Sequence, residues 1–322
     1  MRTRKLGYAD LHLTTVGLGT WAIGGPWQWG WGPQDDAESI QAIQRGLDLG
    51  INWIDTAAAY GVGHAEEVVG RAIAGRRDDL IVATKCGLVW DEGSADVYGR
   101  LTAESVRAEC EASLKRLNVD VIDLYQIHWP HDEEHLEEAW STIADLIQEG
   151  KVRYAGVSNF SVEQIERVQA IHPVASLQPP YSMLDCAVEG ELLPYCAAND
   201  IGVVAYSPMQ NGLLTGKYTK ERIACLPDDD WRKESPQFTE PACNATFALL
   251  DGLRPIAERN GKTLAQLAIA WVLRRPEVTA AIVGARRPSH IEGTAPAGDW
   301  ALSAEDVAEI DALLAQRCQA LA

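Results

Sequence analysis

Asp55, Tyr60, Lys85 and His128 each lie at the end of, or just after, a short apolar run of strand length. In a parallel barrel the C-terminal ends of the strands meet on one face, so side chains distant in sequence can share a site. A phenol grouped there with an ammonium, a carboxylate and an imidazole can donate a proton to a carbonyl oxygen. These four residues are therefore the candidate catalytic residues.

Strand-like runs alternate with helical periods over most of the 322 residues, which favours an α/β fold. The expected strands are 16–18, 53–55, 80–85, 121–127, 154–157, 176–178, 203–206 and 280–283. Eight such units predict a (β/α)₈ TIM barrel, formed as one domain by residues 1–322. The alternative is an open sheet that binds a dinucleotide, which would carry G-x-G-x-x-G after its first strand. Only Gly17 and Gly19 of that pattern are present, which favours the barrel.

The sequence also marks helix starts and two additions to a minimal barrel. Asp36, Thr102, Ser161 and Ser303 precede amphipathic periods and are expected to open helices. The residues around 7–10 predict an N-terminal hairpin that plugs the bottom of the barrel. The segment 207–242, after the seventh strand, is long and rich in Pro, Gly and Asp, which is typical of a functional loop.

Composition excludes several classes of partner. The formal net charge of −18 argues against nucleic acid and anionic membranes, because both require a basic surface. The chain has no apolar run long enough to span a bilayer, and its first residues do not resemble a signal peptide. The seven cysteines show no disulfide or metal-ligand spacing. We therefore expect a cytoplasmic protein with no metal site.

Several motifs occur in a characteristic order. They are GLGTW (17–21), DTAAAYG (55–61), ATK (83–85), IHWP (127–130), GVSNF (156–160), YSP (206–208), GLLTGKY (212–218) and GAR (284–286). Each is weak alone, but the ordered set resembles the aldo-keto reductases and is highly specific. The GLLTGKY segment is similar to the bacterial branch related to channel β-subunits and to inositol- and aldose-linked reductases.

The resemblance implies an oxidoreductase that interconverts carbonyls and alcohols by hydride transfer, with Tyr60 as the general acid. An unperturbed phenol has a pKa of about 10, so Lys85 is expected to make proton loss from Tyr60 easier. Asp55 is expected to hold Lys85 in position. His128 is expected to orient the substrate oxygen.

The resemblance also implies NADP(H) as the cofactor, with NAD(H) as the alternative. Tyr206 is expected against the nicotinamide ring, and the phosphate of NADP near Arg286, where a helix begins. The family usually has Gln and Glu-Asn for the adenosine, whereas this chain has His290, Gly293 and Thr294. The full expected cofactor set is Gly19, Thr20, Trp21, Asp55, Ser158, Asn159, Gln178, Tyr206, Ser207, Pro208, Met209, Gly212, Leu213, Gly216, Lys217, Gly284, Ala285, Arg286, His290 and Thr294.

The expected substrate residues are Trp21, Tyr60, Trp90, His128 and Trp129. Trp27, Trp29 and Trp31 follow the first strand and could equally pack on one another. An aromatic wall suits sugars, steroids and aromatic aldehydes alike. These loops carry no Arg or Lys dedicated to a substrate anion, which favours a neutral carbonyl or a sugar.

Other functions fit parts of the sequence. The same residues would serve a sugar or alcohol dehydrogenase that works in the oxidative direction. A cofactor-sensing binding subunit of the same fold would also retain the four candidate residues. An unrelated barrel hydrolase or isomerase is disfavoured, since metal ligands and paired catalytic carboxylates are missing. The sequence leaves the oligomeric state open.

Overall fold

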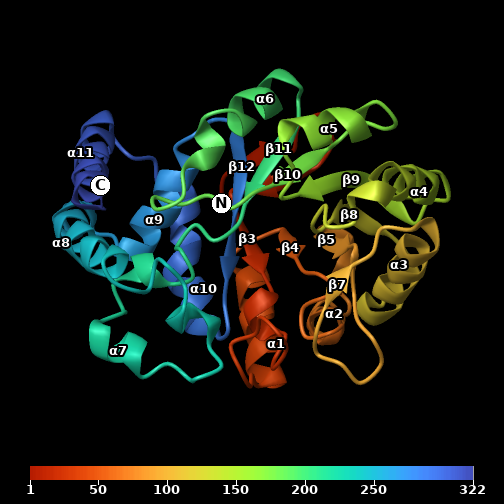
Figure 1. Cartoon of the computed structure of the whole chain (residues 1–322), viewed down its shortest axis with the longest axis horizontal. Helices are drawn as coiled ribbons and strands as arrows, with labels where there is room; N and C mark the ends of the chain where they lie inside the picture. The colour runs from red at the N-terminus through yellow and green to blue at the C-terminus, as the bar shows by residue number, and fades with distance from the viewer. Residues whose placement is uncertain (322) are drawn as a thin grey trace.

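In the computed structural model, which describes residues 1–321, eight parallel strands close a barrel and helices cover its outside (Figure 1). The barrel strands in chain order are β3 (Val16–Gly19), β4 (Trp53–Asp55), β5 (Ile81–Cys86), β8 (Ile122–Ile127), β9 (Val152–Ser158), β10 (Ser176–Gln178), β11 (Gly202–Ala205) and β12 (Val278–Gly284). Every expected strand overlaps one of these. Strand β12 pairs with β3 and closes the ring, so the predicted TIM barrel is confirmed and the open sheet is excluded.

Four helices begin where the sequence places capping residues. The Thr102 side chain caps α3, Ser161 and Gln164 form a capping box at α5, and Asp35 caps the helix that begins at Asp36. Ser303 Oγ accepts a hydrogen bond from the Asp306 N–H at the start of the last helix. The helices are α1 (Asp36–Asp48), α2 (His64–Ala72), α3 (Ala103–Leu117), α4 (Leu136–Gln148), α5 (Val162–Gln169), α6 (Leu192–Ala198), α7 (Lys220–Ala224), α8 (Ala242–Arg259), α9 (Leu264–Leu273), α10 (Pro288–Thr294) and α11 (Ala304–Leu321). Within residues 1–321, no helix combines the length and the apolar character needed to cross a lipid bilayer.

The predicted N-terminal hairpin is present. Strands β1 (Thr3–Lys5) and β2 (His12–Thr14) pair in antiparallel fashion. Leu6 and Leu13 of this hairpin belong to the same buried cluster as Trp53 and Leu124 of the barrel strands. The hairpin therefore fills one end of the barrel and leaves the opposite end for ligands.

Two excursions extend from the end of the barrel where the strands finish. A short hairpin of β6 (Leu88–Val89) and β7 (Tyr98–Gly99) follows β5. The long segment after β11, predicted as a functional loop, contains α7 and the short 3₁₀ helices η5 (Leu213–Thr215) and η6 (Trp231–Lys233). Leu213, Ile223 and Phe238 form a small core inside it, so the segment is folded and not structureless.

Candidate active site

A cavity of about 1370 Å³ opens at the C-terminal end of the barrel strands. Its floor includes residues from four strand ends, namely Gly19, Asp55, Ser158 and Gln178. Ordinary ligand pockets measure roughly 300–1,000 Å³, so this cavity can hold more than one ligand of ordinary size.

Lys85 organises the floor of the cavity. Its Nζ donates to Asp55 Oδ1 at 2.7 Å, to the Thr56 carbonyl oxygen at 2.9 Å and to Tyr60 Oη at 3.0 Å. An ammonium has three protons, and each therefore has an acceptor. Lys85 is 1 % exposed, so this ion pair is shielded from solvent and fixes the position of the Tyr60 hydroxyl.

Close backbone contact brings two loops to Tyr60. Gly61 has φ +63°, and a Cβ added there would lie 1.9 Å from the carbonyl oxygen of Gly24. Only glycine fits such an approach. The loop after β3 can therefore lie against the loop after β4, and the ring centroids of Trp27 and Tyr60 are 6.0 Å apart.

Burial sets the protonation of the two proton-handling groups. Burial raises the pKa of Tyr60 above the usual phenol value, and the Lys85 charge only partly offsets this rise. Burial, assisted by Lys85, holds the pKa of His128 well below its usual value. Their rings pack edge to face with centroids 5.5 Å apart. Lys85 thus acts on Tyr60 with the expected sign, but desolvation outweighs it, so the phenol keeps its proton at neutral pH.

The second carboxylate oxygen of Asp55 accepts hydrogen bonds from two glutamine side chains. Gln178 Nε2 donates to Asp55 Oδ2 at 2.8 Å, and Gln126 Nε2 donates to the same oxygen at 3.4 Å. The sequence argument did not identify Gln126. The signal that could have found it is a polar residue inside an apolar strand, next to Lys85 in register.

A second network links the ends of neighbouring strands. Tyr206 Oη donates to Asn159 Oδ1 at 2.9 Å, and Asn159 Nδ2 donates to the His128 carbonyl oxygen at 3.0 Å. Ser158 Oγ donates to the Gln178 carbonyl oxygen at 2.9 Å. The residues expected to contact a nicotinamide are therefore brought together.

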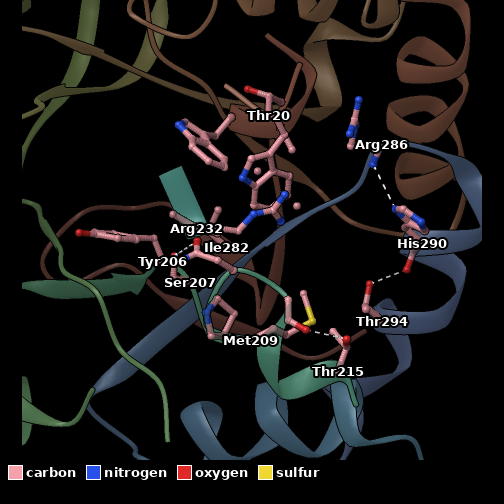
Figure 2. Close-up of a pocket in the computed structure, with 18 of the residues that line it drawn as sticks. Thr20, Tyr206, Ser207, Met209, Thr215, Arg232, Ile282, Arg286, His290 and Thr294 are labelled. Carbon is pink, nitrogen blue, oxygen red and sulfur yellow. Dashed lines mark hydrogen bonds between the residues drawn. The ribbon is translucent and has the colours of Figure 1, made fainter. Parts of the chain in front are cut away.

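The far end of the cavity, beside the loop after β12 and the start of α10, carries basic side chains (Figure 2). Arg286 Nε donates to Gln34 Oε1 at 2.5 Å, and its backbone N–H donates to His290 Nδ1 at 3.4 Å. Burial, together with neighbouring cations, lowers the pKa of His290. Lys217 and Thr294 line the same end. The structure therefore brings together Arg286, His290, Lys217 and Thr294, the residues expected to contact the adenosine and its phosphate.

Most of the predicted residues line the cavity, but five do not. Lys85 is buried behind Tyr60 and donates a hydrogen bond to its hydroxyl. Leu213 is buried in the core of the long segment, and Gly216 and Ala285 are also absent from the cavity wall. Trp90 is outside the wall as well, because its ring packs 5.9 Å from the guanidinium of Arg116.

Arg232 is a cavity residue that sequence reasoning missed. It is buried, and its Nη1 donates to Tyr218 Oη at 2.7 Å while Asp230 accepts from its Nε at 2.9 Å. Its guanidinium lies 4.2 Å from the centre of the Trp31 ring. Figure 2 shows Arg232 in the same pocket as Thr20 and Tyr206. An Arg beside a Trp inside a predicted functional loop was the available signal.

The match to known proteins covers nearly the whole chain. The profile of the Aldo/keto reductase family matches residues 15–315. This chain belongs to the aldo/keto reductase family. Aldo-keto reductases are oxidoreductases that use nicotinamide cofactors on small carbonyl or sugar substrates, and the chain is therefore an enzyme of this type.

Individual aldo-keto reductases are similar to this chain over nearly their full length. Aldo-keto reductase YhdN of Bacillus subtilis is 39 % identical over 98 % of this chain and 94 % of the relative. The NADH-specific methylglyoxal reductase of Escherichia coli is 35 % identical over 95 % of this chain and 96 % of the relative. The structure of glycerol dehydrogenase AKR11B4 from Gluconobacter oxydans has a TM-score of 0.90 at 40 % identity, covering 98 % of this chain and 95 % of that one.

Proposed function

We propose that this aldo-keto reductase is an NADP(H)-dependent carbonyl reductase in which Tyr60 is the general acid. The observation that carries the proposal is the 3.0 Å hydrogen bond from Lys85 Nζ to Tyr60 Oη on the cavity floor. When bound, the reduced nicotinamide supplies hydride to the carbonyl carbon. Tyr60 gives its proton to the carbonyl oxygen, and the Lys85 ammonium stabilises the phenolate that remains. Asp55 holds Lys85, and the neutral His128 orients the oxygen.

The residues around Tyr206 fit a nicotinamide carboxamide. An amide needs both a donor and an acceptor. Gln178 uses its Nε2 on Asp55 and Gln126, and none of the hydrogen bonds among residues 1–321 uses its Oε1. That oxygen is therefore suited to accept from the carboxamide, while Ser158 and Asn159 complete the polar wall.

The charge of the far end favours NADP(H) over NAD(H). Apart from Asp55 and Glu258, the Asp, Glu, Lys and Arg residues of the cavity wall are all cationic, namely Lys217, Arg222, Arg232, Arg254, Lys262, Arg286 and Arg287. This cationic group stands out in a chain of net charge −18. A 2′-phosphate adds negative charge that such a group attracts, and guanidinium groups bind phosphate well. Since one relative is named NADH-specific, both cofactors belong in the test.

The reverse direction is the second candidate function. The same proton donor accepts a proton when an alcohol is oxidised, by microscopic reversibility. The likeness to a structure titled glycerol dehydrogenase favours this possibility. The assay should therefore run both ways.

The test follows the absorbance of NADPH and NADH with a panel of aldehydes, ketones and aldoses, and the reverse reaction with alcohols and sugars. We expect Tyr60→Phe to lower kcat by roughly 10²–10⁴-fold, the usual contribution of general acid catalysis. NADPH binding, measured by fluorescence titration, should stay near normal. The control is Tyr195→Phe, since the Tyr195 hydroxyl lies 3.3 Å from Gln169 on the outer helices. Full activity of Tyr60→Phe would remove the assignment.

A further inference from the structure

Strand β5 carries two adjacent polar residues that point to opposite sides of the barrel wall. Successive side chains of a strand alternate between its two faces. Lys85 points inward and reaches Tyr60 on the cavity floor. Thr84 points outward, and its Oγ1 donates to Glu66 Oε1 of α2 at 2.5 Å. Thr84 and Glu66 are both 0 % exposed, so this polar contact lies in the layer between strands and helices, which is normally apolar.

The other oxygen of Glu66 forms a buried ion pair with α3. Glu66 Oε2 accepts from Arg116 Nε at 2.7 Å, and Arg116 Nη2 lies 2.6 Å from the same oxygen. Such a pair adds little net stability, because the removal of two charges from water offsets much of their attraction. Its directional hydrogen bonds nevertheless fix β5, α2 and α3 relative to one another.

The loop that carries Tyr60 rests on the same arginine. The Tyr60 carbonyl oxygen accepts from the Ala65 N–H at 3.1 Å, which ties the loop to the first turn of α2. Between these residues, Gly63 has φ +101°, and a Cβ added there would lie 2.9 Å from Arg116 Cδ. The Arg116 side chain therefore packs directly against the backbone of this loop.

Glu66 joins these two supports. Thr84 fixes the strand position next to Lys85, and Arg116 fixes the loop of Tyr60. The 3.0 Å hydrogen bond between Lys85 Nζ and Tyr60 Oη therefore depends on a chain of contacts behind the cavity floor. Reacting groups tolerate little displacement, since about 1 Å of misplacement can slow catalysis roughly 10²-fold.

We propose that Glu66 is a positioning residue, which holds Tyr60 against Lys85 from behind the cavity floor. It acts through Thr84 and Arg116. This inference rests on the proposed function, because the group that Glu66 positions is the general acid. Glu66 is buried and is not part of the cavity wall, so it contacts neither cofactor nor substrate. Its loss should therefore slow the chemical step and leave cofactor affinity unchanged.

The test uses variants that change this chain of contacts and little else. Glu66→Gln removes the charge and keeps the shape, and Thr84→Val removes the hydroxyl and keeps the branched side chain. Both should lower the single-turnover rate of NADPH oxidation, measured by stopped flow, by roughly tenfold, while NADPH affinity stays at the wild-type value. Thr84→Ser keeps the hydroxyl and should keep the rate. Glu67→Gln is the matched control, since Glu67 is exposed on the same helix.

A spectroscopic signal separates positioning from the proposed function. In protein labelled with ¹³C at tyrosine Cζ, the Tyr60 resonance is the one missing from Tyr60→Phe. We expect Glu66→Gln and Thr84→Val to shift it and Glu67→Gln to leave it in place, with or without turnover.

Full activity of Tyr60→Phe would overturn the proposed function without moving this resonance. An unshifted Tyr60 resonance and a wild-type single-turnover rate in both variants would overturn the positioning role. If Glu66→Gln does not fold, Thr84→Val decides alone, because it leaves no charge unpaired.

Discussion

Glu109 of α3 is a buried carboxyl that supports the end of the strand carrying Lys85. Its Oε2 accepts from the Gly87 N–H at 2.9 Å, and its Oε1 lies 3.1 Å from Ser105 Oγ. Burial raises the pKa of Glu109 to about 8, against an ordinary value of 4.5, although the Gly87 and Ser105 hydrogen bonds oppose the rise. The folded protein therefore retains a proton at neutral pH that the unfolded chain has lost.

The sign of the pH dependence follows from this difference. The stabilisation from Glu109 is complete below pH 4.5 and is lost as the pH rises through about 8. Each pH unit between these values lowers the free energy of unfolding by about 1.4 kcal/mol. At pH 7 the loss relative to acidic pH reaches about 3 kcal/mol.

Glu109→Gln should remove this pH dependence, because glutamine resembles the neutral acid in shape and in hydrogen bonding. We expect the variant to match the wild type near pH 4 and to exceed its free energy of unfolding by about 3 kcal/mol at pH 7. Urea denaturation followed by tryptophan fluorescence at several pH values measures it. Glu111→Gln is the control on the same helix, since Glu111 pairs with Lys151 at the surface. Parallel pH curves for wild type and Glu109→Gln would refute a protonated Glu109.

Three further outcomes follow from the site. Lys85→Met leaves the Asp55 carboxylate buried without its cation. We therefore expect turnover to fall and the free energy of unfolding to drop by about 3–5 kcal/mol. An unchanged melting temperature would contradict the buried ion pair. Arg286→Ala should raise KM for NADPH by about tenfold more than it raises KM for NADH. The control is Arg76→Ala, because Arg76 pairs with Asp48 at the surface. Equal effects on both cofactors would rule out contact between Arg286 and the 2′-phosphate. Burial raises the pKa of Tyr60 above the ordinary phenol value of 10.0. We therefore expect kcat/KM for reduction to stay constant through neutral pH and to decline only above pH 10.0. An inflection near pH 7 would show that another group is the acid.

The barrel could be predicted from the sequence because parallel strands are buried on both faces and read as apolar runs. The ends of the strands were harder to predict. Strand β9 begins at Val152, before the apolar run, because Val152 pairs with Ile122 through the backbone while the Arg153 guanidinium pairs with the Asp123 carboxylate. Backbone pairing does not require an apolar side chain, so hydrophobic patterning alone cannot locate such an end.

The candidate site also contains residues that the sequence could predict and residues that it could not. Residues at strand ends, such as Asp55 and Lys85, were predictable because the barrel alone fixes where they meet. Residues on excursions were only partly predictable: Met209 and Lys217 line the cavity as expected, whereas Arg232 was missed and Trp90 was wrongly included. Arg232 lies in a segment after β11 that folds on its own small core, and Trp90 lies outside the cavity because its ring packs against the Arg116 guanidinium. The positions of these two side chains depend on contacts that no local pattern contains.

The total charge of the chain argued against anionic macromolecular partners, yet it concealed a group of cationic side chains in the wall of one cavity. An average over the surface says little about the potential inside one cavity, where low-dielectric walls focus the local field. Here Lys217 and Arg286 line one cavity together with many uncharged side chains. Tyr60 lines the same continuous space, so a chain with a large negative net charge still presents cationic side chains to a ligand that binds beside this phenol.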